Sequence, residues 1–225
     1  MKKNASVLIT NYNKGKYLNK SINSCLNQNV SLIEVLIFDD CSTDQSRKLL
    51  KKIKNKKILT TFNLQKKYKS GPLNQINGID IIYKKSKGKI IFLLDGDDYF
   101  KKDKLKYILD KFKHDKKLNF LQDKPFCSKR KKNLELKKKR HTYSIWPSFY
   151  PTSCIAMRRL FFAEFLKLSK KTQFPNLEID ARLSIYAFLK NEFRIIDKNL
   201  TIYNFDQNGI MSKYKKFSFG WWKKR

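Results

Sequence analysis

Three aspartates within four residues, Asp95, Asp97 and Asp98, form the group in this sequence that is best suited to chemistry. They directly follow the apolar run 90–94, which has the composition of a buried strand. Carboxylates this close repel one another unless a positive group lies between them. A hard divalent cation bound through oxygen is such a group, and it usually also holds a phosphate. Because Asp and Gly are also common turn residues, a solvated turn explains the same residues equally well at this point.

A second acidic turn, Asp39 and Asp40, follows the apolar run 33–38. Strand-like and helix-like segments alternate over the first hundred residues, which indicates βαβ units and a parallel sheet. Ligands in such sheets bind at the carboxyl ends of the strands, where Asp39 and Asp95 both fall. The residues 42–45 have the pattern of a capping box for the following helix.

The second half of the sequence is less regular, and we expect α+β structure there within a single domain over residues 1–225. The stretch 123–148 has little periodicity. The segments with a readable pattern are helices at 104–112, 160–168 and 180–189, a strand at 153–157, and short strands at 194–197 and 200–203.

The chain is strongly basic, with 51 Lys and Arg against 19 Asp and Glu, a formal charge of +32. Such a charge suits nucleic acid, an anionic membrane face or a nucleotide substrate, and a coding bias toward Lys, Asn and Ile explains it as well. The densest clusters of basic residues are 129–132 and 137–140.

No apolar segment approaches a membrane-spanning length and no signal peptide is visible, so we expect a cytoplasmic protein. Four Cys and two His lack zinc-site spacing.

Four segments that contain turns lie along the first half of the chain, at residues 10–13, 38–44, 71–78 and 94–98. In the order and spacing of these segments the chain resembles family 2 glycosyltransferases of the nucleotide-diphospho-sugar transferase type. The resemblance is specific over residues 5–100 and weaker beyond them. It implies the GT-A fold, a Rossmann-like, mostly parallel sheet flanked by helices, with a nucleotide-sugar-binding half (1–100) and an acceptor-binding half (101–225).

The resemblance also implies roles for the residues at these turns. Tyr12 would stack on the nucleotide base and Asp39 would accept a hydrogen bond from it, although Tyr12 also suits packing at a strand edge. Asp95 would lie near the ribose, and Asp97 or Asp98, the DXD-type acids, would bind Mn²⁺ or Mg²⁺. The other residues expected to bind the nucleotide sugar are Thr10, Asn13, Asp40, Asn77 and Gly96, and for Asp40 a capping or turn role is an equal alternative. Lys14 could add a positive contact.

An inverting transfer needs a base that deprotonates the acceptor hydroxyl. By resemblance, the acids before the helix at 180–189 supply it: we favour Asp180, with Glu178 as the alternative. An acid stabilised by the helix dipole is the competing interpretation. His141 could also reach the acceptor or a phosphate, with a surface histidine that has no role in the site as the favoured interpretation. The chain departs from the family pattern at Thr10, where Pro is usual, at Cys41 (Gly) and at Ile76 (Arg).

The sequence therefore predicts a metal-dependent, inverting glycosyltransferase that moves one sugar from a nucleotide-diphospho-sugar to a cell-surface glycan or a lipid-linked acceptor. We expect it at the anionic inner membrane face, held there by basic and aromatic residues such as Trp221 and Trp222. Two alternatives are a nucleic-acid-binding protein, for which no motif is present, and a sugar nucleotidyltransferase, which would need a Gly-rich phosphate loop. We expect no nucleic acid partner.

Overall fold

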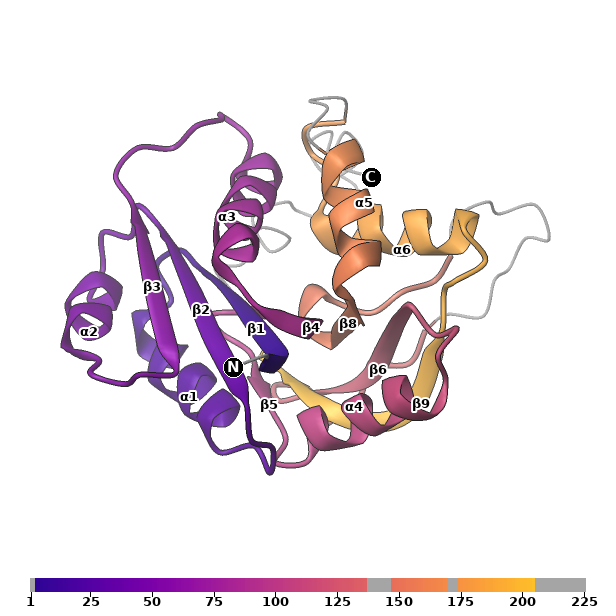
Figure 1. Cartoon of the computed structure of the whole chain (residues 1–225). Coiled ribbons are helices and arrows are strands. Elements are labelled where there is room, and N and C mark those ends of the chain that lie inside the picture. Colours follow the sequence, from indigo (N-terminus) through magenta and orange to yellow (C-terminus); the bar gives the residue numbers. More distant parts are fainter. Residues whose placement is uncertain (1–2, 137–146, 170–173, 205–225) are drawn as a thin grey trace.

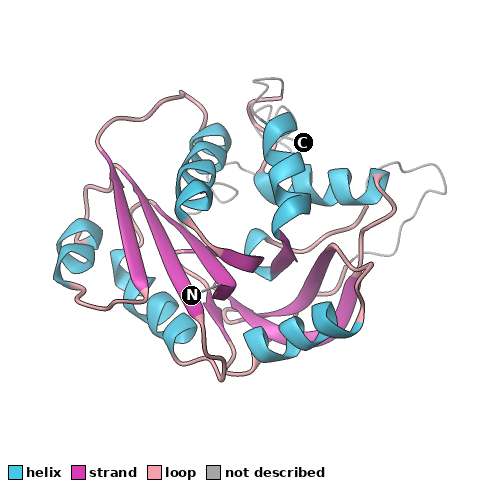
Figure 2. Cartoon of the chain, in the orientation of Figure 1, coloured by secondary structure: helices cyan, strands magenta, loops and turns pink. Residues whose placement is uncertain are grey.

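The computed structural model describes residues 3–136, 147–169 and 174–204, which form one mixed β-sheet with helices on both faces (Figures 1 and 2). The strands are β1 (Lys3–Asn11), β2 (Ile33–Asp40), β3 (Ile58–Asn63), β4 (Gly88–Asp95), β5 (Tyr99–Phe100), β6 (Phe120–Cys127), β7 (Lys132–Asn133), β8 (Ile155–Arg158) and β9 (Ile195–Tyr203). The helices are α1 (Gly15–Leu26), α2 (Ser46–Lys52), α3 (Gly71–Lys85), α4 (Lys104–His114), the 3₁₀ turn η1 (Thr152–Cys154), α5 (Arg159–Ser169) and α6 (Ile179–Leu189).

The first half confirms the predicted βαβ pattern. Strands β3, β2, β1 and β4 lie side by side in that order, and each neighbouring pair is parallel. Parallel strands present all their carboxyl ends at one edge of the sheet. The turns that follow β1, β2 and β4 therefore gather at this edge.

The second half continues the same sheet with mixed pairing. Strand β8 is antiparallel to both β4 and β6, and β6 runs parallel to β9 with register shifts near Lys124. Two expectations were wrong here. The stretch thought irregular begins with most of strand β6, and the two short strands predicted at 194–197 and 200–203 are the single strand β9. Pro125 interrupts the apolar pattern of β6, which explains why the sequence did not indicate a strand.

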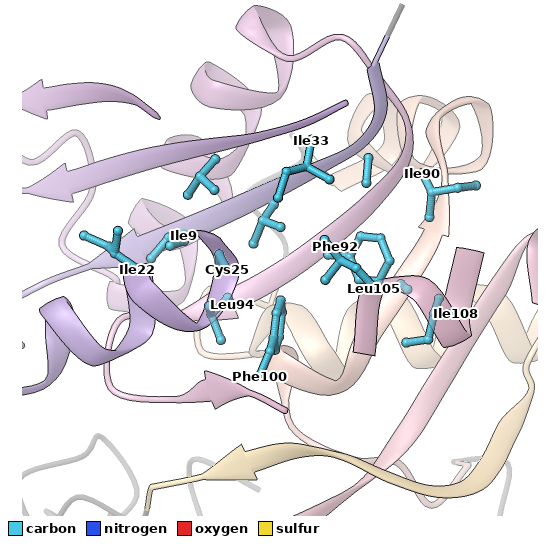
Figure 3. Close-up of a cluster of buried hydrophobic side chains, with 14 of the residues drawn as sticks. Ile9, Ile22, Cys25, Ile33, Ile90, Phe92, Leu94, Phe100, Leu105 and Ile108 are labelled. Carbon is cyan, nitrogen blue, oxygen red and sulfur yellow. The ribbon is translucent and has the colours of Figure 1, made fainter. Parts of the chain in front are cut away.

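Two hydrophobic clusters cover the two faces of the sheet. One joins alternate strand residues such as Ile9 and Phe92 to α1 and α4, and Figure 3 shows Ile22 and Cys25 from α1 with Leu105 and Ile108 from α4 beside them. The other joins the opposite strand faces to α3, α5 and α6, which lie together above the sheet in Figure 1. Burial of strands β1, β2 and β4 on both faces fixes the position of their carboxyl ends.

In the part of the chain that the structure describes, none of the helices combines the length and the apolar character that crossing a bilayer requires. The basic residues 137–140, His141, Trp221 and Trp222 lie outside the described residues. Their predicted contacts stay predictions.

Candidate functional site

The two acidic turns predicted to share an edge lie on either side of β1. Thr10 is in register with Asp95 of β4, and Asn11 is in register with Asp39 of β2. Neighbouring strands are about 4.8 Å apart, so the two turns are separated by roughly 10 Å of sheet. Asp39 and Asp95 therefore lie at the same edge of the sheet, although their side chains leave it on opposite faces, because Asn11 and Thr10 are consecutive residues of β1.

Asp39 is fully buried and holds the second turn against the end of β1. Its Oδ1 accepts a hydrogen bond from Asn11 Nδ2 at 2.7 Å, and its Oδ2 accepts one from the Ser42 backbone N–H at 3.2 Å. The neighbouring Asp40 accepts a hydrogen bond from Asn63 Nδ2 at 2.9 Å, which joins it to β3. Both acids thus have partners within the protein, and their contacts with a nucleotide stay predictions.

The capping box predicted at residues 42–45 is wrong. Ser42 Oγ accepts a hydrogen bond from the Asn13 N–H at 2.9 Å instead of capping α2. Helix α2 begins at Ser46, whose N–H donates to Asp44 Oδ1 at 2.9 Å, while the Gly15 N–H at the start of α1 donates to Asp44 Oδ2 at 2.8 Å. The turn therefore ties the first turns of α1 and α2 together, a long-range use that local spacing did not reveal.

Tyr12 projects from the first turn, and 46% of it is exposed. The ammonium of Lys66 lies 3.6 Å from the centre of the Tyr12 ring. Next to it, Asn13 has a φ of 54°, a backbone conformation that Asn tolerates better than most residues, and its Oδ1 accepts a hydrogen bond from the Thr43 N–H at 2.7 Å. The ring is accessible for stacking, but a base would share its face with a cation.

Asp95 is held by two side chains from different elements. Gln75 Nε2, from α3, donates to Asp95 Oδ1 at 2.8 Å and to Thr10 Oγ1 at 3.1 Å, and Thr10 Oγ1 donates to Asp95 Oδ1 at 3.3 Å. The sequence did not indicate Gln75; it indicated Asn77. Residues two apart on a helix do not face the same way, so Gln75 and Asn77 leave α3 in different directions, and a contact of Asn77 with the nucleotide sugar stays a prediction. One signal was available in the sequence: Thr10 stands where the family usually has Pro, and its hydroxyl needs a polar partner, which Gln75 supplies.

Gly96 follows Asp95 at a point where the chain passes very close to β1. The Gly96 N–H donates to the Thr10 carbonyl at 2.9 Å, and a Cβ at this position would lie 2.8 Å from Asn11 Oδ1. A larger residue would therefore have to displace either the Asn11 side chain or the turn itself. Asn11 Oδ1 is buried and has no hydrogen-bond donor among the described residues.

The two acids predicted to bind metal have different surroundings. Asp97 is partly exposed, and its Oδ2 lies 2.6 Å from Lys14 Nζ. Asp98 is buried; its Oδ2 accepts from Ser153 Oγ at 2.5 Å and its Oδ1 from the Asn204 N–H at 2.7 Å. Asp97 is thus the more accessible ligand, while Asp98 joins the turn to η1 and to the end of β9.

Negative charges from both halves of the chain act on the same region. Burial, followed by the charges of Asp97 and Asp180, raises the pKa of Asp95 to about 7. Burial, followed by the charges of Asp98 and Asp95 and then of Asp97 and Asp180, also raises the pKa of Tyr203. The structure therefore brings Asp180, which belongs to α6, within electrostatic reach of the acidic turn after β4.

The two candidate bases lie at the start of α6. Glu178 is the N-cap residue, and Asp180 lies in the first turn, where its Oδ1 accepts a hydrogen bond from the Ala181 N–H at 2.7 Å. An acid in a first helical turn is also favoured by the helix dipole. The placement agrees with both interpretations of the sequence, and the identity of a base stays a prediction.

The residues present fit a divalent cation that a diphosphate helps to hold. Among the described residues, no three His, Cys, Asp or Glu side chains form a group ready to bind a metal ion. Asp97, however, offers carboxylate oxygens that already attract the cationic Lys14. Cations such as Mg²⁺ are commonly bound through one or two carboxylates plus substrate phosphates.

Two of the hollows on the described surface bear on the location of the site. One, of about 190 Å³, adjoins the acidic turn and is lined by Tyr17, Lys20, Asp97, Tyr99, Ser128 and Asn204. The other, of about 520 Å³, lies at the opposite edge of the sheet, near the amino ends of β1 and β4. Among the predicted site residues, Asp97 lines the smaller hollow, whereas Asp39, Asp95 and Asp180 do not. Through Asp97 this hollow adjoins the carboxyl edge of the sheet, where ligands of such sheets bind.

A model of the family described as "Glycosyl transferase family 2" matches residues 6–172. The chain belongs to glycosyl transferase family 2. Among its curated relatives are the poly(ribitol-phosphate) β-N-acetylglucosaminyltransferase TarS of Staphylococcus aureus, 34% identical over 45% of this chain and 17% of TarS, and an uncharacterized glycosyltransferase of Haemophilus influenzae, 36% identical over 52% of this chain and 41% of that protein. The family 2 chain therefore matches well under half of the length of either relative.

Solved structures agree with this fold. TarS from S. aureus in complex with UDP-GlcNAc aligns with a TM-score of 0.71 at 17% identity, over 98% of this chain and 64% of that chain. A mannosyltransferase of Pyrobaculum calidifontis in complex with GDP-Man and Mn²⁺ aligns with a TM-score of 0.63 at 14% identity, over 95% of this chain and 60% of that chain. The predicted α/β fold of GT-A type is confirmed.

Proposed function

We propose that this family 2 chain is a metal-dependent, inverting glycosyltransferase that moves one sugar from a nucleotide-diphospho-sugar to a glycan or lipid-linked acceptor. The observation that carries the proposal is the shared edge of the sheet, where Asp39 and Asp95 flank the end of β1. Membership of family 2 supports the reaction class.

The donor would lie across the ends of β1, β2 and β4. Tyr12 would stack on the base after its ring exchanges the Lys66 ammonium for the ligand. Asp39 would orient the base, and Asp95, held by Gln75, would receive the ribose hydroxyls. Each role rests on the side chain's position at this edge together with the family resemblance.

Asp97 would hold a Mn²⁺ or Mg²⁺ ion together with the two phosphates of the donor. Such an ion, when bound, neutralises charge that develops on the departing nucleoside diphosphate. Lys14, now 2.6 Å from Asp97, is close enough to move onto a phosphate oxygen. Asp98, whose two oxygens have protein partners, would support the turn and not the ion.

Asp180 would act as the base of the transfer. Its carboxylate takes the proton of the acceptor hydroxyl while that oxygen forms a bond to the anomeric carbon from the face opposite the phosphates. The bond from that carbon to the phosphate oxygen breaks, and its electron pair leaves with the nucleoside diphosphate.

The acceptor class is supported by the names of two further relatives. A Campylobacter jejuni relative is named a GalNAc(5)-diNAcBac-PP-undecaprenol β-1,3-glucosyltransferase, and an Escherichia coli relative a UDP-Glc:α-D-GlcNAc-diphosphoundecaprenol β-1,3-glucosyltransferase. Both names describe acceptors on a lipid diphosphate. An acceptor of this kind lies at an anionic membrane surface, which the net charge of +32 would attract from the cytoplasmic side.

The proposal is tested by a thermal-shift panel on the full chain. UDP, GDP, UDP-GlcNAc and GDP-mannose are each added with Mn²⁺, with Mg²⁺ or with excess chelator. At a ligand concentration of 100 times Kd, binding stabilises the fold by about 2.7 kcal/mol. We expect at least one nucleotide to raise the melting temperature only when metal is present.

Asp97→Asn then separates the site from the fold. We expect this variant to keep the melting temperature of the free protein, to lose the metal-dependent shift, and to lose transfer by a factor of about 10² or more, as when one charge-stabilising group is removed. Asp110→Asn, in the exposed part of α4, is the matched control and should behave like the wild type. Full activity of Asp97→Asn, or in excess chelator, contradicts the proposal. Nucleic-acid binding that survives Asp97→Asn and falls steeply with salt would favour the alternative function.

A further inference from the structure

We propose that Ser153 is a positioning residue that fixes the acidic turn from both ends and thereby sets the affinity of the site for its metal and diphosphate. This inference rests on the proposed function. Ser153 lies in η1, and it is fully buried. Its Oγ accepts a hydrogen bond from the Asp95 N–H at 3.1 Å and donates one to Asp98 Oδ2 at 2.5 Å. One hydroxyl therefore joins the first and the last residue of the turn.

The turn needs such a fixed support because repulsion between its negative charges would otherwise distort it. Three carboxylates lie within four residues, and they repel one another whenever they are ionised. The backbone contributes one bond across the turn, from the Asp98 N–H to the Asp95 carbonyl at 3.0 Å, and one to β1 from Gly96. Ser153 adds the contacts from the second half of the chain. Asp97, the accessible acid, lies between the residues that these bonds immobilise.

Ser153 is itself held by a buried ion pair. Lys104 Nζ donates to the Ser153 carbonyl at 2.8 Å, to Asp123 Oδ1 at 2.5 Å and to Thr201 Oγ1 at 2.5 Å. Lys104 and Asp123 are completely buried. A buried charge with this many partners has little freedom to move, because every displacement would leave a partner unsatisfied. Helix α4 and strands β6 and β9 thus determine where η1 places the hydroxyl.

Asp98 completes the support, since its other oxygen accepts from the Asn204 N–H at 2.7 Å. With both oxygens used, Asp98 transmits the position of Ser153 to the turn instead of binding the ion. Groups that orient a metal ligand typically change metal affinity by about 10- to 100-fold when they are removed. We therefore expect removal of the Ser153 hydroxyl to weaken Mn²⁺ binding by about tenfold.

The experiment measures Mn²⁺ binding by the full chain in the presence of UDP or GDP, following free Mn²⁺ by electron paramagnetic resonance. Ser153→Ala should raise the Mn²⁺ concentration for half-saturation by about tenfold. Ser169→Ala is the matched control, because Ser169 is also buried and donates only within α5, to the Leu166 carbonyl at 3.1 Å. It should lose comparable thermal stability and keep the wild-type Mn²⁺ affinity. Ser153→Thr, which restores the hydroxyl, should recover affinity.

Asp98→Asn keeps the inference falsifiable if Ser153→Ala fails to fold. It should weaken Mn²⁺ binding in the same range, and where Ser153→Ala folds, the double variant should show much less than the product of the two effects, because the residues act through one bond. Unchanged Mn²⁺ affinity in Ser153→Ala or in Asp98→Asn overturns the inference and leaves the proposed function standing. If the wild type binds no nucleotide with Mn²⁺ or Mg²⁺, the proposed function fails, and this inference fails with it.

Discussion

The two halves of the sheet contribute to the site in different ways. In the first half, the acids lie directly after parallel strands, and the strand register alone brings Asp39 and Asp95 to one edge. In the second half, the contribution is a buried polar group: Lys104 and Asp123 hold Ser153, which holds the acidic turn. In the proposed function, the first half thus presents groups to the donor, and the second half holds these groups in place and supplies the candidate base.

The largest effect should come from the one second-half residue proposed to touch the acceptor. Asp180→Asn should lower the turnover rate by about 10²- to 10⁴-fold, the usual contribution of a general base. Metal-dependent nucleotide binding should survive, because the variant keeps the donor residues at the ends of β1, β2 and β4. The two quantities are measured by initial rates at saturating donor and by thermal shift with UDP or GDP.

Glu178→Gln is the comparison for this variant. We expect only a small change in rate, because Glu178 is the N-cap residue of α6 and not the favoured base. A larger loss in Glu178→Gln than in Asp180→Asn would reverse the assignment of the base. If neither variant loses activity, both acids would have only a helix-dipole role. The second half would then contribute no base to the reaction.

The same contrast explains what the sequence could predict. The strands and acidic turns of the first half follow from local apolar runs, so the location of Asp39 and Asp95 at strand ends could be predicted from the sequence, while their contacts with a ligand stay predictions. Gln75 was not, because nothing in the pattern of a helix says which polar residue meets a strand end 20 positions away. Ser153 was missed for the same reason.

Strands of the second half were harder to predict because their signals are broken. Strand β6 contains Pro125 and pairs with β9 through register shifts, so neither strand has a regular alternation of apolar and polar residues. Lys104 is buried although its residue type is almost always exposed. The ammonium is compensated by the long-range partners Asp123, Ser153 and Thr201. Partners this distant in sequence cannot be read from local spacing.

The next prediction concerns whether the buried ion pair of the second half supports the acidic turn. Lys104→Met removes the cation and leaves Asp123 buried without it, so we expect the free energy of unfolding to fall by about 3–5 kcal/mol. Urea denaturation measures this change. The double variant Lys104→Met with Asp123→Leu should recover much of the loss, because an apolar pair leaves no uncompensated charge. A loss below about 1 kcal/mol in the single variant would mean that the buried pair does not hold the turn.

The smallest effect separates two neighbouring residues of α3 in the first half. Gln75→Ala removes a hydrogen bond to Asp95 at 2.8 Å. We expect the free energy of nucleotide binding to become less favourable by about 1 kcal/mol, the net contribution of a typical hydrogen bond. Asn77→Ala should stay within about 0.5 kcal/mol of the wild type, because Asn77 lies two residues from Gln75 on α3 and so leaves the helix in a different direction. Isothermal titration of both variants with UDP or GDP and Mn²⁺ measures the difference. A greater loss in Asn77→Ala would show that the family pattern locates the donor contacts better than the geometry of α3, and it would weaken the view that strand register alone assembles the first half of the site.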